Sequence, residues 1–124
     1  MWKIIVFLLL FLSYLSYSFI VYTKGTENNI SVPVAEQAII NEGKLLFQKH
    51  NCISCHQLYG LGGYLGTDLT TAFSDAARGE MFIKTFLQAG GRRMPNFHFT
   101  KKEIDAITSY LKYVDKTAVT YKIP

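Results

Sequence analysis

The feature that most constrains this chain is a short motif near its middle, Cys52-Ile53-Ser54-Cys55-His56. It contains the only two cysteines among 124 residues, and a histidine directly follows the second one. Two thiols at this spacing can form a disulfide, contribute to a zinc site, act as a redox pair or attach a cofactor. Each role requires a different surrounding fold, so the choice among them decides much about the class of protein.

The first three roles fit the rest of the chain poorly. A disulfide between cysteines three positions apart closes a very small ring and stabilises little. A structural zinc site needs four ligands, and only His50, His56 and His98 remain to complete one, with His56 too close to Cys55 for the usual spacing. A thioredoxin-like pair is typical of a βαβ unit, which the sequence does not show.

Cys-x-x-Cys-His is the attachment signature of c-type haem. The two thiols add to the two vinyl groups of the haem and form thioethers, and the histidine is then held beneath the iron. The motif therefore predicts one covalent haem c, bound through Cys52 and Cys55, with His56 as the proximal iron ligand.

The second axial ligand is predicted to be Met94, in the segment Gly-Gly-Arg-Arg-Met-Pro-Asn-Phe. Pro95 biases Met94 toward an extended backbone, and the two glycines suit a loop that reaches the opposite face of the haem. With histidine and methionine both bound, the iron has no room for a substrate. We therefore expect electron transfer, at a raised reduction potential, and no catalysis by this chain itself.

Three other side chains are alternatives for that position. Met81 falls on a predicted helix and is expected in the core. His98 would give a bis-histidine iron, and His50 is expected on a helix surface. The neighbouring Arg92 and Arg93 are candidates to pair with haem propionates or with acidic groups of a partner, because guanidinium suits carboxylate pairing.

The N-terminal region is an uncharged run of 19 residues, Ile4 to Tyr22, flanked by Lys3 and Lys24. A helix of this length crosses a hydrocarbon core of about 30 Å. The alternative is a cleaved signal peptide with a weak site at Ser16-Tyr17-Ser18. We expect a transmembrane anchor over residues 1–24, a short linker over 25–33 and an exported domain over 34–124.

The exported part is predicted to be all-α, because helical spacing of apolar residues occurs in three segments and no strand-like alternation is sustained. The first segment runs from Val34 to about Asn51 and carries Ile39, Leu46 and Phe47, with Gly43 permitting a close helix approach. The second runs from Gly79 to Ala89. A Thr100–Glu103 capping box opens the third, with a stripe of Ile104, Ile107, Tyr110, Leu111 and Val114. Residues 57–70 are predicted to be a glycine-rich loop. Residues 25–124 carry 11 basic and 9 acidic residues, a balance too even to indicate nucleic-acid binding.

The anchor, the NCISCH motif and the segment GGRRMPNFHFTKKEIDAITSYLKYV together resemble membrane-bound class I cytochromes c. More narrowly, with the loop HQLYGLGGYLGTDLT, they resemble the small cytochrome c subunit of bacterial cytochrome-c-dependent nitric oxide reductases. The resemblance implies a class I cytochrome c domain on the periplasmic or extracellular side of the cytoplasmic membrane.

The resemblance also implies partners. They are a large multi-helix catalytic subunit in the membrane and a soluble electron donor such as a small cytochrome or a copper protein. It further implies a calcium ion at the subunit interface, held by backbone oxygens near Gly62 and Tyr64. Two alternatives remain: the cytochrome subunit of a haem-copper oxygen reductase, or a free-standing membrane-tethered electron shuttle.

Overall fold

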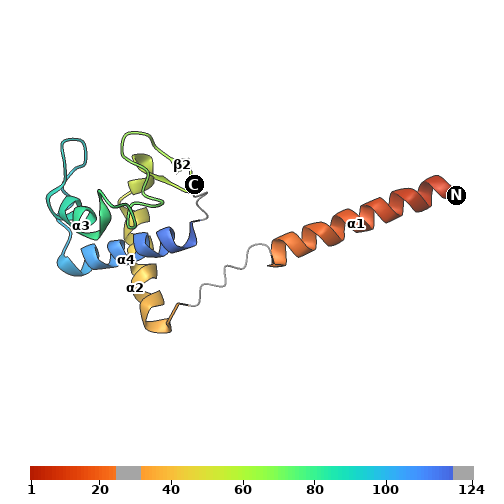
Figure 1. Cartoon of the computed structure of the whole chain (residues 1–124), viewed down its shortest axis with the longest axis horizontal. Coiled ribbons are helices and arrows are strands. Elements are labelled where there is room, and N and C mark those ends of the chain that lie inside the picture. The colour runs from red at the N-terminus through yellow and green to blue at the C-terminus, as the bar shows by residue number, and fades with distance from the viewer. Residues whose placement is uncertain (25–31, 119–124) are drawn as a thin grey trace. The chain divides into compact units, whose positions relative to one another are not determined.

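The computed structural model describes residues 1–24 and 32–118 (Figure 1). The chain divides into two compact units, Met1–Ser31 and Val32–Pro124. In the first, helix α1 runs from Trp2 to Lys24 and buries none of its residues. By length and composition α1 can cross a membrane, although a signal sequence would pass the same test. Most of the predicted linker lies outside the described residues.

The second unit is mostly helical, as predicted from the periodicity. Its elements in chain order are helix α2 (Val34–Lys49), a 3-10 turn η1 (Cys52–Ser54), strands β1 (Gln57–Leu58) and β2 (Leu61–Gly62), and helices α3 (Gly79–Ala89) and α4 (Lys101–Thr117). The bounds of α3 are those predicted. At the start of α4 the Thr100 side chain accepts from the Glu103 backbone, and Glu103 accepts from the Thr100 backbone, which confirms the capping box.

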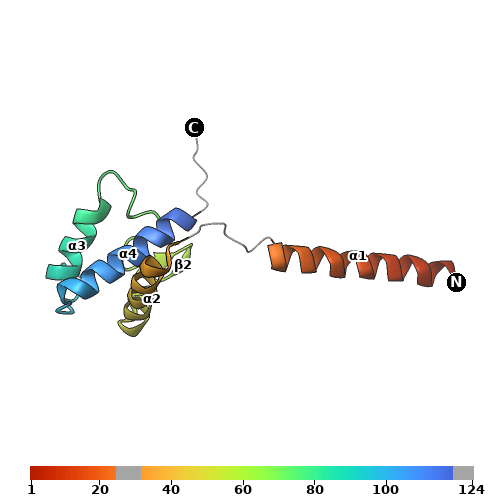
Figure 2. The ribbon, with the colours of Figure 1, turned by 90° about the horizontal axis from the view of Figure 1, so that it is seen from below.

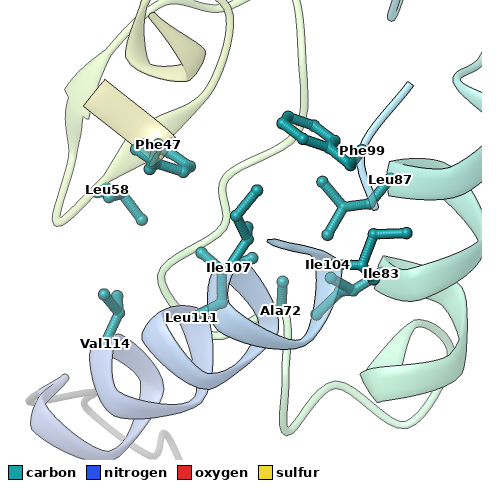
Figure 3. Close-up of a cluster of buried hydrophobic side chains, with 10 residues drawn as sticks. All are labelled: Phe47, Leu58, Ala72, Ile83, Leu87, Phe99, Ile104, Ile107, Leu111 and Val114. Carbon is teal, nitrogen blue, oxygen red and sulfur yellow. The ribbon is translucent and has the colours of Figure 1, made fainter. Parts of the chain in front are cut away.

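Helix α4 is the centre of this unit, because it packs on both α2 and α3, more extensively on α2 (Figure 2). Its buried residues belong to a hydrophobic cluster to which all three helices and the segments between them contribute (Figure 3). That cluster consists of Phe47, Leu58, Ala72, Ile83, Leu87, Phe99, Ile104, Ile107, Leu111 and Val114. The predicted stripe on α4 is therefore confirmed, with Tyr110 partly buried at its edge.

The crossing of α2 and α4 depends on Gly43, as predicted. A Cβ at position 43 would overlap the carbonyl group of Ala106 and lie 2.9 Å from the Cβ of Tyr110. One turn further along α2, the rings of Phe47 and Tyr110 meet with their centroids 5.6 Å apart. The two backbones can approach this closely only where one of them carries no side chain.

Three predicted placements are wrong. On α2 the buried face is Ile40, Gly43 and Phe47, while Ile39 is exposed. Gly43 has to face α4, and this requirement sets the rotation of the helix. Met81 is 77% exposed rather than in the core. It lies two positions before Ile83, whose face α3 buries, and two positions turn a side chain to the far side of a helix.

His50, the third, is not on an open helix surface. It caps the C-terminus of α2 and is partly buried. Its ring lies edge-on to Phe97 at 5.1 Å and to Phe99 at 4.8 Å between centroids. His50 therefore packs as an aromatic residue where the segment after α3 returns to the end of α2.

The predicted loop over residues 57–70 contains a small hairpin. β1 and β2 pair antiparallel, Gln57 with Gly62 and Leu58 with Leu61. Tyr59 and Gly60 form the two-residue turn with φ of 53° and 77°, and positive φ at both positions suits a tight hairpin. The Tyr59 hydroxyl donates to the carbonyl of Val114 at 3.2 Å, which ties the turn to α4.

Candidate cofactor site

The Cys-x-x-Cys-His motif is folded into one tight turn directly after α2. Asn51 adopts the left-handed conformation (φ 51°) and reverses the chain, and asparagine is among the residues that tolerate it best. The amides of Cys55 and His56 both donate to the carbonyl of Cys52, at 3.2 and 2.9 Å. Cys52 and His56 therefore lie about one helical turn apart, with Cys55 between them.

Backbone hydrogen bonds hold the glycine-rich loop against this turn. Gly63 donates to the carbonyl of Ile53 at 2.9 Å, and Gly66 donates to the carbonyl of Cys55 at 2.7 Å. A Cβ at Gly63 would overlap the carbonyl group of Ser54. The glycines are thus required for close packing on the motif, a role that the sequence pattern alone did not reveal.

The same loop orients the imidazole of His56. Its Nδ1 lies 2.8 Å from the carbonyl oxygen of Thr67. Because a carbonyl only accepts, Nδ1 carries the hydrogen, and in the neutral ring Nε2 then presents a lone pair. A Cβ at Gly66 would lie 2.5 Å from Nδ1 and 2.8 Å from Nε2. The hydrogen bond therefore selects the tautomer in which Nε2 is available to bind a metal.

An ionic anchor fixes the segment that carries Thr67. The guanidinium of Arg78 donates to Asp75 Oδ2 through Nε at 2.8 Å and Nη2 at 2.6 Å, and to the carbonyl of Asp68 through Nη1 at 3.1 Å. These hydrogen bonds hold the pKa of Asp75 below its usual value. Leu69 further donates to the carbonyl of Gln57 at 3.0 Å. The backbone that directly follows the histidine contact is therefore tethered.

The two cysteines are free thiols of intermediate exposure. Burial raises the pKa of Cys52 to about 11. A thiol with that pKa is protonated at neutral pH, whereas thiol–disulfide exchange uses the thiolate, so the raised pKa disfavours a redox pair. Within residues 1–24 and 32–118, no group of three or more His, Cys, Asp or Glu could hold a metal ion.

Met94 is partly buried and packs against the core cluster, as Cys52 also does. The alternative ligands are placed differently. Met81 is exposed on α3, His98 is exposed with φ of 55°, and His50 packs edge-on against both Phe97 and Phe99. Of the predicted candidates, Met94 is the thioether that the fold brings to the core.

The remaining predicted site residues are at the surface. Arg92 and Arg93 are exposed beside Met94 and form no ion pair within the described parts of the chain. Gly62 and Tyr64 are also exposed, Tyr64 at 88%. The calcium site at their backbone oxygens stays a prediction.

The aromatic residues near the motif divide into two groups. Phe99 is buried and Phe73 and Phe97 are partly buried against the cluster, so these three contribute to the core. Tyr59, Tyr64, Phe82 and Phe86 keep 37% or more of their surface exposed. A pair of free thiols, an oriented imidazole and a thioether packed on the core are donor groups of the kinds that hold a c-type haem.

These features define the class of a c-type cytochrome, an electron-transfer protein built around haem c. The model of the family "Cytochrome C oxidase, cbb3-type, subunit III" matches residues 38–111, and the chain belongs to this family. The matched segment begins within α2 and ends within α4, and it includes the Cys-x-x-Cys-His motif and Met94. Family membership implies a haem c cofactor.

Curated relatives resemble the chain more specifically. It is 33% identical over 84 residues to the nitric oxide reductase C subunit of Stutzerimonas stutzeri, covering 60% of this chain and 57% of the relative. It is 28% identical over 85 residues to the protein of that name from Halomonas halodenitrificans, covering 59% and 57%. The corresponding protein of Cereibacter sphaeroides is 28% identical over 86 residues, covering 60% and 58%. The chain therefore spans less than two thirds of the length of these relatives.

Two functional features were not identified from the sequence. Thr67 acts through its backbone carbonyl, which every residue has, so its side chain carries no signal. Gly66 and Gly63 were recognised only as part of a glycine-rich loop. A run of glycines within ten or so residues after a haem motif would have been the usable signal, since glycine is required wherever two backbones meet closely.

Proposed function

We propose that the chain is the membrane-anchored electron-transfer subunit of a respiratory nitric oxide reductase. Cys52 and Cys55 would hold the haem as thioethers, with His56 and Met94 as the axial ligands. The observation that carries this proposal is the contact of His56 Nδ1 with the Thr67 carbonyl, which leaves Nε2 available within a Cys-x-x-Cys-His turn. When bound, haem c supplies a one-electron couple, and a histidine–methionine pair raises its potential.

The rest of the chain fits a relay between two partners. α1 would anchor the chain, with the cytochrome domain on the periplasmic or extracellular side. Arg92 and Arg93 have no acidic partner in the described residues, so they are available to propionates or to acidic groups of a soluble donor. Electrons would then pass to a large catalytic subunit. This step is consistent with relatives that are named as the C subunit of a nitric oxide reductase.

A second function is favoured by the family description, which refers to a cbb3-type cytochrome c oxidase. The same anchored module would then deliver electrons to an oxygen reductase. Purification of the intact chain in mild detergent distinguishes these functions, with co-purifying subunits identified by mass spectrometry. We expect a large membrane partner and nitric oxide consumption by the complex. Oxygen consumption alone would support the second function, and recovery of the chain without a partner would indicate a shuttle.

Replacing Met94 by alanine tests the axial ligand. We expect haem to remain covalently attached, the methionine-to-ferric-iron charge-transfer absorption to disappear, and the ferrous form to bind carbon monoxide. The physical reason is that the thioether closes the sixth position, and alanine has no donor atom. His98→Ala is the matched control and should leave both properties unchanged. An unaltered spectrum and no carbon monoxide binding in Met94→Ala would exclude the methionine.

Replacing Gly66 by alanine tests the orientation of His56. The added methyl group would force the imidazole away from the Thr67 carbonyl, at a cost of about 1–3 kcal/mol for overpacking. A histidine ligand that loses this hydrogen bond donates less electron density, so we expect the reduction potential to rise in a redox titration. Thr67→Ala is the control, because it keeps the carbonyl and should leave the potential unchanged. An unchanged potential in Gly66→Ala would contradict the assigned role.

A further inference from the structure

The segment that carries Met94 is a closed turn rather than an extended strap. α3 ends at Ala89, and Gly90 follows with φ of 72° and ψ of −164°. The amide of Gly91 then donates to the carbonyl of Met94 at 2.8 Å, which closes the turn over Arg92 and Arg93. The amide of Gly90 donates to the carbonyl of Phe86 at 2.8 Å. Met94 is therefore connected to the last turn of α3 by the hydrogen bonds of Gly90 and Gly91.

The ring of Phe86 lies directly against this turn. A Cβ at position 91 would be 2.8 Å from Cε1 and 3.2 Å from Cδ1 of Phe86, and 3.9 Å from the Cβ of Met94. Phe86 also contacts Phe82, with ring centroids 4.5 Å apart. The Phe86 ring therefore contacts both Phe82 and the site of Gly91, one turn of helix before the methionine segment begins.

Gly91 is required here for space and not for backbone conformation. Gly90 has positive φ, but Gly91 does not, so its backbone conformation is one that alanine can adopt. What opposes a side chain at position 91 is the Phe86 ring. At position 90 the obstacles are backbone atoms, the Met94 carbonyl oxygen at 2.9 Å and the Asn96 amide nitrogen at 3.0 Å. The two adjacent glycines therefore have physically different roles.

We propose that Phe86 is a positioning residue for the Met94 ligand, acting through contact of its ring with Gly91. This inference rests on the proposed role of Met94 at the iron. Methionine is unbranched and flexible, so its side chain alone does not determine where the sulfur lies. The position of the Gly91–Met94 turn against α3 determines it, and the Phe86 ring sets the distance between the two.

A double-mutant cycle on the full-length haem-loaded chain tests this. The variants are Gly91→Ala, Phe86→Leu and the two combined, and the readouts are ferric charge-transfer absorption and ferrous carbon monoxide binding. We expect Gly91→Ala to lose most of the charge-transfer absorption and to bind carbon monoxide roughly tenfold more tightly, since contacting residues couple by up to a few kcal/mol. Adding Phe86→Leu should restore the absorption by making room for the methyl group.

Two controls separate positioning from general loss of stability. Gly90→Ala should also weaken the absorption, but Phe86→Leu should not rescue it, because its obstacles are backbone atoms. Phe86→Tyr keeps the ring, so it should preserve the absorption by itself and fail to rescue Gly91→Ala. Far-UV circular dichroism and urea unfolding of each variant establish that the spectra come from folded protein.

The outcomes distinguish this inference from the function on which it rests. If Met94→Ala leaves the spectrum unchanged, the methionine assignment fails and the role of Phe86 fails with it. If Met94→Ala opens the iron but Gly91→Ala does not, only the positioning role is excluded. The role is also excluded if Phe86→Leu rescues neither glycine variant, or both equally.

Discussion

Replacing both Cys52 and Cys55 by alanine is expected to abolish covalent haem in this protein. The prediction follows from chemistry, because a thioether to a vinyl group requires sulfur and the chain contains no other cysteine. A denaturing gel stained for haem peroxidase activity, together with the Soret absorption of the purified chain, measures the outcome. Haem that remains on the denatured double variant would exclude attachment through these thiols.

Single replacements make the test more informative. Cys52→Ala and Cys55→Ala each leave one sulfur, so each variant should retain haem through one bond and show a shifted ferrous spectrum. Ser54→Ala is the matched control within the same turn. It removes a hydroxyl that donates to the Asn51 carbonyl at 2.8 Å, but no cofactor bond, so full attachment is expected.

Replacing Gly43 by alanine is expected to have the largest effect on folding. Alanine is favoured over glycine in a helix by about 1 kcal/mol, but its methyl group would overlap the Ala106 carbonyl group. This obstacle is backbone, which cannot change rotamer, so α2 and α4 must separate along their whole contact. Such overpacking lowers the free energy of unfolding by about 3 kcal/mol or more. The steric cost therefore exceeds the gain in helix propensity.

Urea unfolding of the full chain in detergent, followed by circular dichroism, measures this loss. Asn41→Ala is the matched control, since Asn41 is exposed on the same helix and gains helix propensity without a new contact. It should leave the midpoint unchanged or raise it slightly. A Gly43→Ala midpoint equal to that of Asn41→Ala would show that α2 and α4 do not pack as described.

Local sequence signals predicted those parts of the fold that depend on local chemistry. The capping box of Thr100 and Glu103 marked the start of α4, and Gly79 and Ala89 bounded α3 as expected. Both depend on backbone groups within one or two turns. On α2, Gly43 and Phe47 were predicted correctly, but Ile39 was predicted on the packed face in place of Ile40. Two adjacent isoleucines are equivalent in composition, and only the partner helix distinguishes them.

The candidate site also combines features that the local sequence predicted with features that only the tertiary structure shows. Cys52, Cys55, His56 and Met94 were predicted from residue type and spacing, because few side chains bind iron or form thioethers. The contacts that orient them come from Thr67, Gly66 and Phe86, and none of these is marked by its residue type. A carbonyl, a missing side chain and a phenyl ring acquire their roles only from what lies next to them.

The sequence by itself determined the chemistry of this protein: a haem-binding motif, a candidate axial thioether, an apolar N-terminal helix and helices with recognisable ends. Each of these is encoded within a few neighbouring residues. Only the tertiary structure decided which face of α2 meets α4, where His50 and Met81 lie, and how His56 and the Met94 turn are held. Those features arise from contacts between segments distant in the chain, and steric fit between such segments has no local sequence pattern.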